Sequence, residues 1–221
     1  MIKHYNNILT EKEILTYVNL VKQQYYENKF KYHEDTKSVE FSFSSEIYMY
    51  ESCVERLDKI IKADFGSNYT YSHCFPRVYL NGSVLLPHTD RDGLDITLSV
   101  NLFNDTEQEW PLHVSNIHLN HEELGEIFDT LSTEQEILPS FFEQQTSFEE
   151  LYNKALKEDK GILERLNSHK IYSSPVCTSH GSGAAFNTAG RIHWRYPLKC
   201  AEDKKYIQIF YHWKKDEFVS N

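Results

Sequence analysis

Apolar residues near the start of the chain recur at the spacing of an α-helix. Between residues 11 and 28 they return every three or four positions, which predicts an amphipathic helix. Thr10 with Glu13 three residues later has the form of a capping box at the start of this helix. The apolar positions are Ile14, Val18, Val21 and Tyr25.

A second helical stripe follows a short alternating segment at residues 39–43, which is typical of a strand. Ser45 can cap this helix, and we expect the helix to end near Gly66. Two helices ahead of a β-rich segment indicate a layer that packs against one face of a sheet. The stripe consists of Ile47, Tyr50, Val54, Leu57 and Ile61.

From residue 69 onward the pattern becomes that of strands. Residues 69–79 are rich in aromatic and β-branched side chains, and Asn81-Gly82 is a turn signal. Residues 95–103 alternate, with an uncharged polar face that indicates either the lining of a barrel interior or a half-solvated edge strand. That polar face carries Thr97, Ser99 and Asn101, and further strands are predicted at 171–177, 183–186 and 206–211.

Residues 104–170 have the pattern of a helical insertion. Asn120 with Glu123, and Ser147 with Glu150, are further capping-box pairs. No Gly/Ser linker separates this segment from its neighbours, so we expect one domain over residues 1–221. Its predicted parts are mainly helical support at 1–66, a β core at 69–116 and 171–214, and an insertion or lid at 104–170.

Composition narrows the class of protein. With 40% hydrophobic and 14% aromatic residues the chain can bury a large core. A net charge of −10 argues against nucleic acid and against an anionic membrane surface as partners. The four cysteines form no CxxC pair, and the N-terminus lacks the apolar region of a signal peptide. We therefore expect reduced thiols and a cytoplasmic protein, whose oligomeric state the sequence leaves open.

The stretch "LPHTDRDG" carries the first candidate chemistry. His88 and Asp90 are two residues apart, so in a strand both side chains point to the same side. His193, in "GRIHWRYPL", is the expected third partner. Two histidines and one carboxylate leave three open positions on an octahedral Fe(II), whereas zinc is more usually held tetrahedrally. An isolated HxD pair is common by chance, so its context has to support it.

That context resembles a known family. "RVYLNGSVLLPHTDRDGLDITLSVNLFND" resembles the prolyl 4-hydroxylase-like branch of the Fe(II)/2-oxoglutarate dioxygenases. "EWPLHV", "GSGAAF", "HWRYPL" and "YIQIFYHW" are similar to later segments of bacterial and phage members. The resemblance covers about residues 70–116 and 171–214, and leaves the N-terminal helices and the insertion unmatched. Its matching residues in the first segment are Tyr79, Gly82, Pro87, His88, Asp90 and 97–105.

The resemblance implies an α+β fold with a double-stranded β-helix, or jelly roll, core and N-terminal helices packed on it. It implies Fe(II) held by His88, Asp90 and His193, with 2-oxoglutarate as cosubstrate and O₂ as oxidant. The implied reaction hydroxylates an unactivated C–H of an amino acid, a peptidyl residue or a small metabolite, and releases succinate and CO₂. Two alternatives remain: a cupin-like metal-dependent hydrolase or isomerase without 2-oxoglutarate, and a non-enzymatic jelly-roll binding module.

The same resemblance implies a cation for the far carboxylate of 2-oxoglutarate, because a buried carboxylate needs a cationic partner. Aligning the last strand on His212 places this cation at Lys204. A shift of one residue would select Lys205 instead. Arg195, two residues after His193, is the second candidate.

Other residues are expected around the same site. Tyr79, Thr97 and Asn101 are candidates for the cofactor pocket. Arg91 and Trp194 are candidates for contacts with substrate. For Arg91 the favoured alternative is a salt bridge with Asp92 or Asp95, and for Trp194 it is a place in the core.

Overall fold

The computed structural model describes residues 1–34, 37–40, 51–91, 93–115, 150, 173–176 and 179–216, and its β-strands form two sheets. Every pair of neighbouring strands is antiparallel. The large sheet has seven strands in the order β1 (Ile2–Tyr5), β9 (Gly183–Asn187), β6 (Ile96–Asn104), β11 (Tyr206–Lys215), β4 (Tyr69–Tyr79), β3 (Ser38–Glu40) and β2 (Lys31–His33). The small sheet has four strands in the order β5 (Leu85–His88), β10 (His193–Arg195), β7 (Leu112–Ser115) and β8 (Ser173–Val176).

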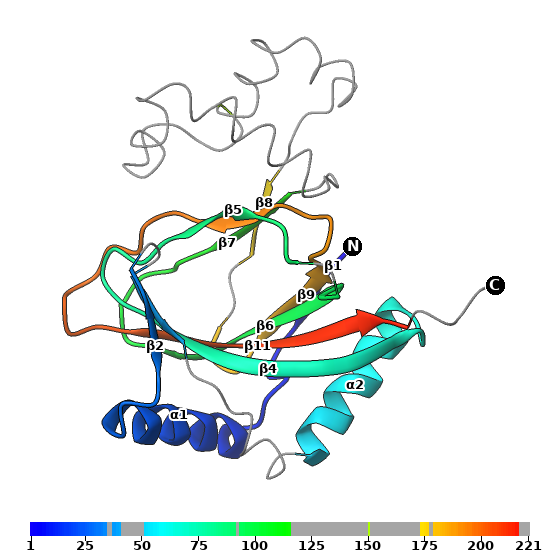
Figure 1. The fold of residues 1–221 in the computed structure, drawn as a ribbon, viewed down its shortest axis with the longest axis horizontal. Coiled ribbons are helices and arrows are strands. Elements are labelled where there is room, and N and C mark those ends of the chain that lie inside the picture. Colours follow the sequence, from blue (N-terminus) through cyan, green and yellow to red (C-terminus); the bar gives the residue numbers. More distant parts are fainter. Residues whose placement is uncertain are drawn as a thin grey trace.

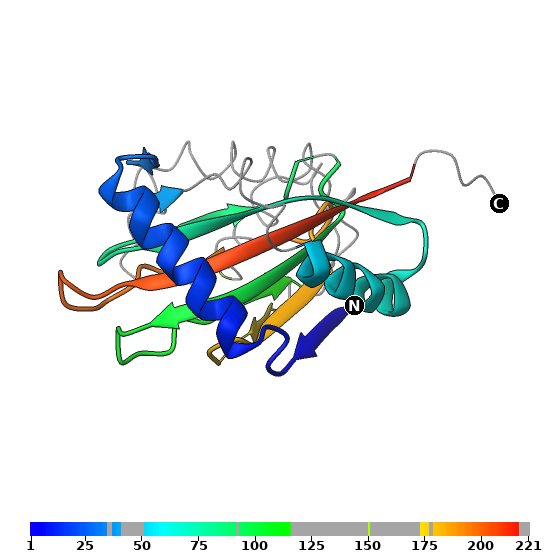
Figure 2. The ribbon, with the colours of Figure 1, turned by 90° about the horizontal axis from the view of Figure 1, so that it is seen from below.

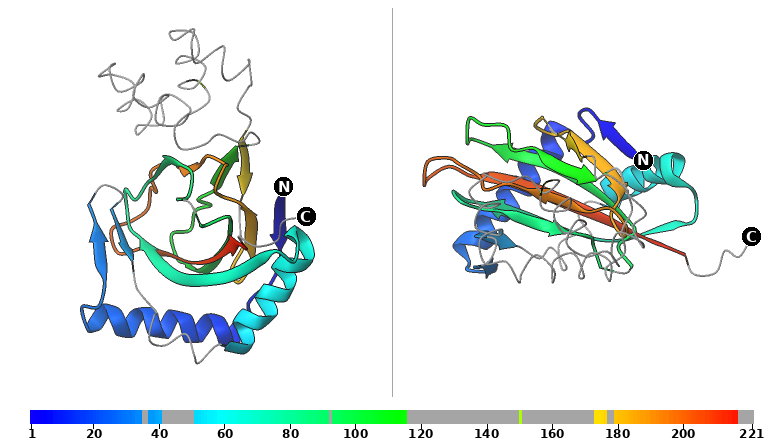
Figure 3. Two further views of the ribbon diagram at one scale, coloured as in Figure 1. Left: turned by 45° about the vertical axis from the view of Figure 1, so that its right-hand side comes forward. Right: turned by 90° about the horizontal axis from the view of Figure 1, so that it is seen from above.

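The two sheets face each other, as Figures 1 and 3 show. Along the chain, β5 lies in the small sheet, β6 in the large one, and β7 and β8 in the small one again. The chain then returns to the large sheet with β9, to the small sheet with β10 and to the large sheet with β11. This exchange between two facing antiparallel sheets is the arrangement of a jelly roll. The predicted double-stranded β-helix is therefore confirmed.

Two helices cover the outer face of the large sheet, where Figure 2 shows α1 crossing the strands. The first, α1 (Glu11–Tyr26), begins at the predicted capping box of Thr10 and Glu13. The second, α2 (Glu51–Phe65), ends at Gly66, whose φ of +118° favours glycine. Residues 41–50, including the predicted cap at Ser45, lie outside the described residues.

Strand β6 separates the apolar core from the interior between the sheets. Ile96, Leu98 and Val100 belong to one buried cluster with side chains of α1 and α2. Thr97 and Ser99, on the opposite face, are buried and line a cavity between the two sheets. The strand is central in the sheet, so its polar face lines an interior and is not a solvated edge.

The described part of residues 104–170 includes a strand of the small sheet. Residues 112–115 form β7, which pairs with β8 so that Ser115 lies opposite Ser173. The core therefore extends to Ser115, within the range predicted for the insertion. The helices predicted from the capping boxes of Asn120 and Ser147 fall in residues 116–149 and 151–172, which lie outside the described residues, apart from Glu150.

Within the described part of the chain, Cys53, Cys74 and Cys200 are free thiols, and Cys177 lies outside it. None of the helices described here has the length and apolar character needed to cross a membrane.

Candidate metal centre

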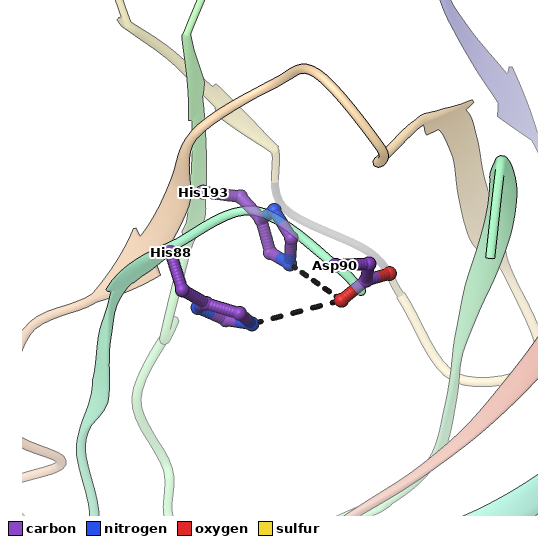
Figure 4. Close-up of side chains that lie close together, drawn as sticks. All are labelled: His88, Asp90 and His193. Atoms are coloured by element: carbon purple, nitrogen blue, oxygen red, sulfur yellow. Dashed lines mark ion pairs between the residues drawn. The ribbon is translucent and has the colours of Figure 1, made fainter. Parts of the chain in front are cut away.

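Strands β5 and β10 bring two histidines together. His88 ends β5 and His193 begins β10, and the two residues lie opposite each other in the antiparallel pair. Asp90 follows His88 by two residues, and its backbone N–H donates to the Thr188 carbonyl at 3.1 Å, which fixes the turn. The three side chains point toward one another in Figure 4. The sequence-predicted triad is therefore assembled by strand pairing.

The geometry of the triad suits a metal ion. Asp90 Oδ1 lies 3.7 Å from His88 Nε2 and 3.6 Å from His193 Nε2. One ligand atom from each residue lies within 4.8 Å of the other two. His193 Nδ1 lies 3.0 Å from the Arg191 carbonyl. Because a carbonyl can only accept, Nδ1 carries the hydrogen and the lone pair of Nε2 faces the metal position.

Asp90 is held as a carboxylate. Burial alone would raise its pKa, but the neighbouring imidazoles of His193 and His88 outweigh burial and lower the pKa below its usual value. The Thr97 hydroxyl donates to Asp90 Oδ2 at 2.8 Å. One carboxylate oxygen is thus used inside the protein, while the other faces the two histidines.

A cavity of about 110 Å³ lies between the sheets beside the triad. All three triad residues line it, together with Tyr79, Thr97 and Arg195 of the predicted cofactor set. Asn101 does not line this cavity; it lines a second hollow beside Trp110 and Tyr206.

Arg195 places a buried cation in the cavity wall. Only 2% of the residue is exposed. Its guanidinium carbon lies 4.5 Å from the ring centre of Trp110, 5.4 Å from that of Tyr206 and 6.0 Å from that of Tyr79. Nε and Nη1 have no hydrogen-bond partner among the described residues. A buried cation is costly without a counter-charge, so this site is suited to an anionic group of a ligand.

Lys204 and Lys205 lie elsewhere. Both precede β11; Lys204 is half-buried, Lys205 is exposed, and neither lines the cavity. The Lys205 backbone N–H donates to Asp105 Oδ1 at 2.6 Å. Their predicted roles toward a cosubstrate stay predictions.

The two candidate substrate residues lie apart from the cavity as well. Arg91 is exposed. Trp194 is 1% exposed and stacks on His113, with ring centres 5.3 Å apart. Neither residue lines the cavity of the triad.

Four polar cavity residues, Ser99 among them, were not predicted to have a functional role. Arg77 precedes Tyr79 by two positions on β4, and Gln208 and His212 alternate along β11. The period of two along each strand is the signal that places them on the inward face. Arg77 donates to Glu40 on β3, so its charge already has a partner.

Comparison with known proteins supports the fold. The sequence matches no family model and no curated protein. A prolyl-4-hydroxylase from Pseudomonas putida is similar in structure, with a TM-score of 0.57 and 10% identity over 97% of this chain and 92% of that one.

Two further solved structures are similar in fold to this chain. HygX from Streptomyces hygroscopicus, with nickel, 2-oxoglutarate and hygromycin B bound, gives a TM-score of 0.55 and 12% identity, over 99% of this chain and 84% of HygX. SnoK, an alpha-ketoglutarate-dependent carbocyclase from nogalamycin biosynthesis, gives 0.58 and 11% over 99% and 83%.

The chain thus has the double-stranded β-helix fold of the Fe(II)/2-oxoglutarate oxygenases. The resemblance to the prolyl 4-hydroxylase-like branch, seen in the sequence motifs, is confirmed at the level of the fold, with a compatible His-Asp-His triad.

Proposed function

We propose that this protein is an Fe(II)- and 2-oxoglutarate-dependent oxygenase. The observation that carries the proposal is one cavity that holds both the His88-Asp90-His193 triad and the buried guanidinium of Arg195, whose Nε and Nη1 have no hydrogen-bond partner among the described residues. A 2-His-1-carboxylate set with open positions fits Fe(II) and a chelating keto acid. The guanidinium fits the second carboxylate that 2-oxoglutarate carries.

Within this proposal Arg195, and not Lys204, holds the far carboxylate of 2-oxoglutarate. Arg195 lies on the cavity wall and lacks an acidic partner among the described residues, whereas Lys204 does not line the cavity. The rings of Tyr79, Trp110 and Tyr206 surround the guanidinium and keep water away from it. A low local dielectric strengthens the pairing of a guanidinium with a carboxylate.

The protein's own groups supply binding and orientation. His88 and His193 would bind the metal as neutral imidazoles and Asp90 as a carboxylate. When bound, iron and 2-oxoglutarate supply the oxidant from O₂, and 2-oxoglutarate becomes succinate and CO₂.

We propose hydroxylation of an unactivated C–H in an amino acid, a peptidyl residue or a small metabolite as the outcome, following the resemblance to prolyl 4-hydroxylases. The carboxylate of Asp90 argues against halogenation, because in that variant chemistry a small residue replaces this ligand.

An anaerobic titration tests the proposal. Fe(II) is added to the purified protein with and without 2-oxoglutarate, and the visible charge-transfer band of the chelated keto acid is recorded. We expect a saturable band that is lost in His88→Ala, Asp90→Ala and His193→Ala. The exposed His4→Ala is the matched control and should keep it.

The alternatives give other results. Tight metal binding without the band would favour a cupin-like hydrolase or isomerase. Absence of metal binding would favour a jelly-roll binding module. A screen of amino acids, peptides and metabolites, scored by succinate release, then searches for the substrate.

A further inference from the structure

The second oxygen of Asp90 begins a chain of hydrogen bonds that leads away from the metal position. Thr97 Oγ1 donates to Asp90 Oδ2 at 2.8 Å and lies 2.9 Å from His212 Nδ1. It also lies 3.1 Å from Thr188 Oγ1. Thr97 on β6 and His212 on β11 are directly opposite in the sheet, so the pairing of two central strands holds them together.

Counting hydrogens fixes the direction of this chain. A hydroxyl has one hydrogen, and that of Thr97 goes to the Asp90 carboxylate, which can only accept. Thr188 has acceptors for its own hydrogen, the Leu94 carbonyl at 2.9 Å and the Asp90 carboxylate, so that hydrogen is not available to Thr97. Thr97 must therefore accept from His212, whose Nδ1 carries a hydrogen. His212 Nε2 is then a bare acceptor, and it has no partner in the described part of the chain.

The surroundings keep this ring neutral and in place. Burial lowers the pKa of His212 to about 4, although Asp90 acts in the opposite direction. Only 3% of the residue is exposed. Its ring stacks on Phe75 with centres 5.3 Å apart and packs against His73 at 4.9 Å. A neutral imidazole clamped between rings is a rigid hydrogen-bond donor.

We propose that His212 is a positioning residue that acts through Thr97 to hold Asp90 by Oδ2, so that only Oδ1 faces the two histidines. A carboxylate released from this chain could turn and bind a metal through both oxygens, which would occupy a position that a ligand needs. The inference rests on the proposed metal role of Asp90, and it is independent of 2-oxoglutarate.

The first test uses the metal-free protein. Nitrogen NMR of the histidine rings should show His212 as the tautomer with hydrogen on Nδ1 and a bare Nε2. The opposite tautomer would overturn the proposal, because Thr97 could not then accept from the ring and also donate to Asp90.

The second test measures Co(II) binding and the visible Co(II) spectrum. His212→Phe and Thr97→Val should each weaken Co(II) binding about tenfold to a hundredfold and change the spectrum, as expected when a partner of a ligand is lost. Combining them should add little, because both remove the same chain. His212→Asn, whose amide can donate in the place of Nδ1–H, should restore most of the affinity. His73→Phe, which alters a ring beside His212 but not the chain, is the matched control.

Asp90→Ala separates the two proposals. If Asp90→Ala also binds Co(II) like the unmodified protein, the metal centre itself is wrong. If Asp90→Ala loses Co(II) and His212→Phe does not, the metal centre stands and the role of His212 is refuted. Should His212→Phe fail to fold, His212→Asn and the NMR of the unmodified protein still decide, since the proposal requires the Nδ1–H tautomer and retained affinity.

Discussion

The side chains around Arg195 are what make it a candidate ligand-binding residue. Three aromatic rings enclose its guanidinium: those of Tyr79 on β4, Trp110 before β7, and Tyr206 on β11. The guanidinium has no acidic partner among the described residues. Desolvating this cation costs free energy in the folded protein unless an anion completes the site. A ligand carboxylate is the group that would complete it.

We predict that Arg195→Met raises the KM for 2-oxoglutarate about a hundredfold, or about 3 kcal/mol, because the ligand carboxylate is left unpaired in a low-dielectric pocket. Arg195→Lys should recover only part of this loss, since an ammonium restores the charge but cannot form two parallel hydrogen bonds. Steady-state succinate release measures both. Lys204→Met and Lys205→Met are the controls and should bind 2-oxoglutarate normally. A large loss in Lys204→Met with a normal Arg195→Met would instead support the alignment on His212.

The sequence predicts the triad better than its surroundings. His88 and Asp90 are two residues apart at a strand end, so a local rule brings them together. Arg195 follows His193 by the same spacing, which made it a candidate. Its surroundings, however, come from Tyr79, Trp110 and Tyr206, which are far apart in the sequence and meet only in the folded protein. A sequence alignment carries no information about this packing, so it could not favour Arg195 over Lys204.

At the scale of elements, α1 and α2 are joined by one carboxylate. Glu13 Oε2 accepts from the Thr10 backbone N–H at 2.7 Å and from Arg56 Nη2 at 2.9 Å. Arg56 Nη1 also donates to the Ile8 carbonyl at 2.6 Å. The capping box of one helix is therefore also the docking point for the other.

We predict that Glu13→Gln lowers the free energy of unfolding by about 1 kcal/mol at pH 7, because the amide can still accept from the Thr10 N–H but loses the negative charge that pairs with Arg56 and favours the helix N-terminus. Burial alone would raise the pKa of Glu13, but hydrogen bonds from Thr10 and Arg56 outweigh it and lower the pKa. Because the pKa of Glu13 is lower in the folded state, its ionised form stabilises the folded protein at pH values above the unfolded-state pKa of about 4.3. This stabilisation is lost as the pH falls through the folded-state pKa. Urea unfolding across this range should show the difference from the unmodified protein shrinking in acid.

The exposed Glu11, in the same helical turn, is the matched control for this prediction. Glu11→Gln should leave the pH dependence of unfolding unchanged. If the free energy of unfolding depended on pH in the same way in Glu13→Gln and in the unmodified protein, ionisation of Glu13 would not be the source of that dependence.

Gly183 is a second point at which elements meet. A Cβ at this position would lie 2.8 Å from the Ser99 carbonyl oxygen and 2.9 Å from Val100 Cγ2, on the neighbouring β6. We predict that Gly183→Ala destabilises the protein by about 1–3 kcal/mol, because one of the paired strands must shift. Thermal unfolding measures this change. Gly93→Asn is the control, since apart from its two chain neighbours no atom of the described residues lies within 4 Å of a Cβ there, and asparagine tolerates its φ of +83°.

Strand length decided which elements the sequence could reveal. The long alternating segments were predicted as strands and form β4, β6 and β11. Strands β1 and β10, of four and three residues, were not predicted as strands, because so short a segment shows no clear period of two. The division into two sheets depends on these short strands, so here it came from the family resemblance and not from periodicity.

At the scale of the molecule, the strands on either side of residues 116–172 are neighbours in the small sheet. β7 and β8 pair directly, and Ser115 lies opposite Ser173. In an antiparallel pair, residues opposite each other are about 5 Å apart, a distance that a short turn can span. The residues between them are therefore not needed to connect the two strands.

This connection makes the role of the segment testable. We predict that replacing residues 121–168 by a short Gly/Ser turn leaves Fe(II) and 2-oxoglutarate binding intact, because every triad residue and Arg195 lie outside that range. We propose that the segment governs substrate choice, as segments that enter and leave a barrel beside its site often do. The shortened protein should then release more succinate per hydroxylated product, since the oxidant would form without a substrate held in reach.

The comparison needs a substrate found by the succinate screen, and product and succinate are measured on the same samples. Normal coupling in the shortened protein would show that the segment serves another purpose, such as contact with a partner. Binding of Fe(II) with loss of 2-oxoglutarate would show that the segment completes the cosubstrate pocket. Circular dichroism first establishes that the β core has formed, because only a folded core makes either result informative. The direct pairing of β7 with β8 is the physical reason to expect that it forms.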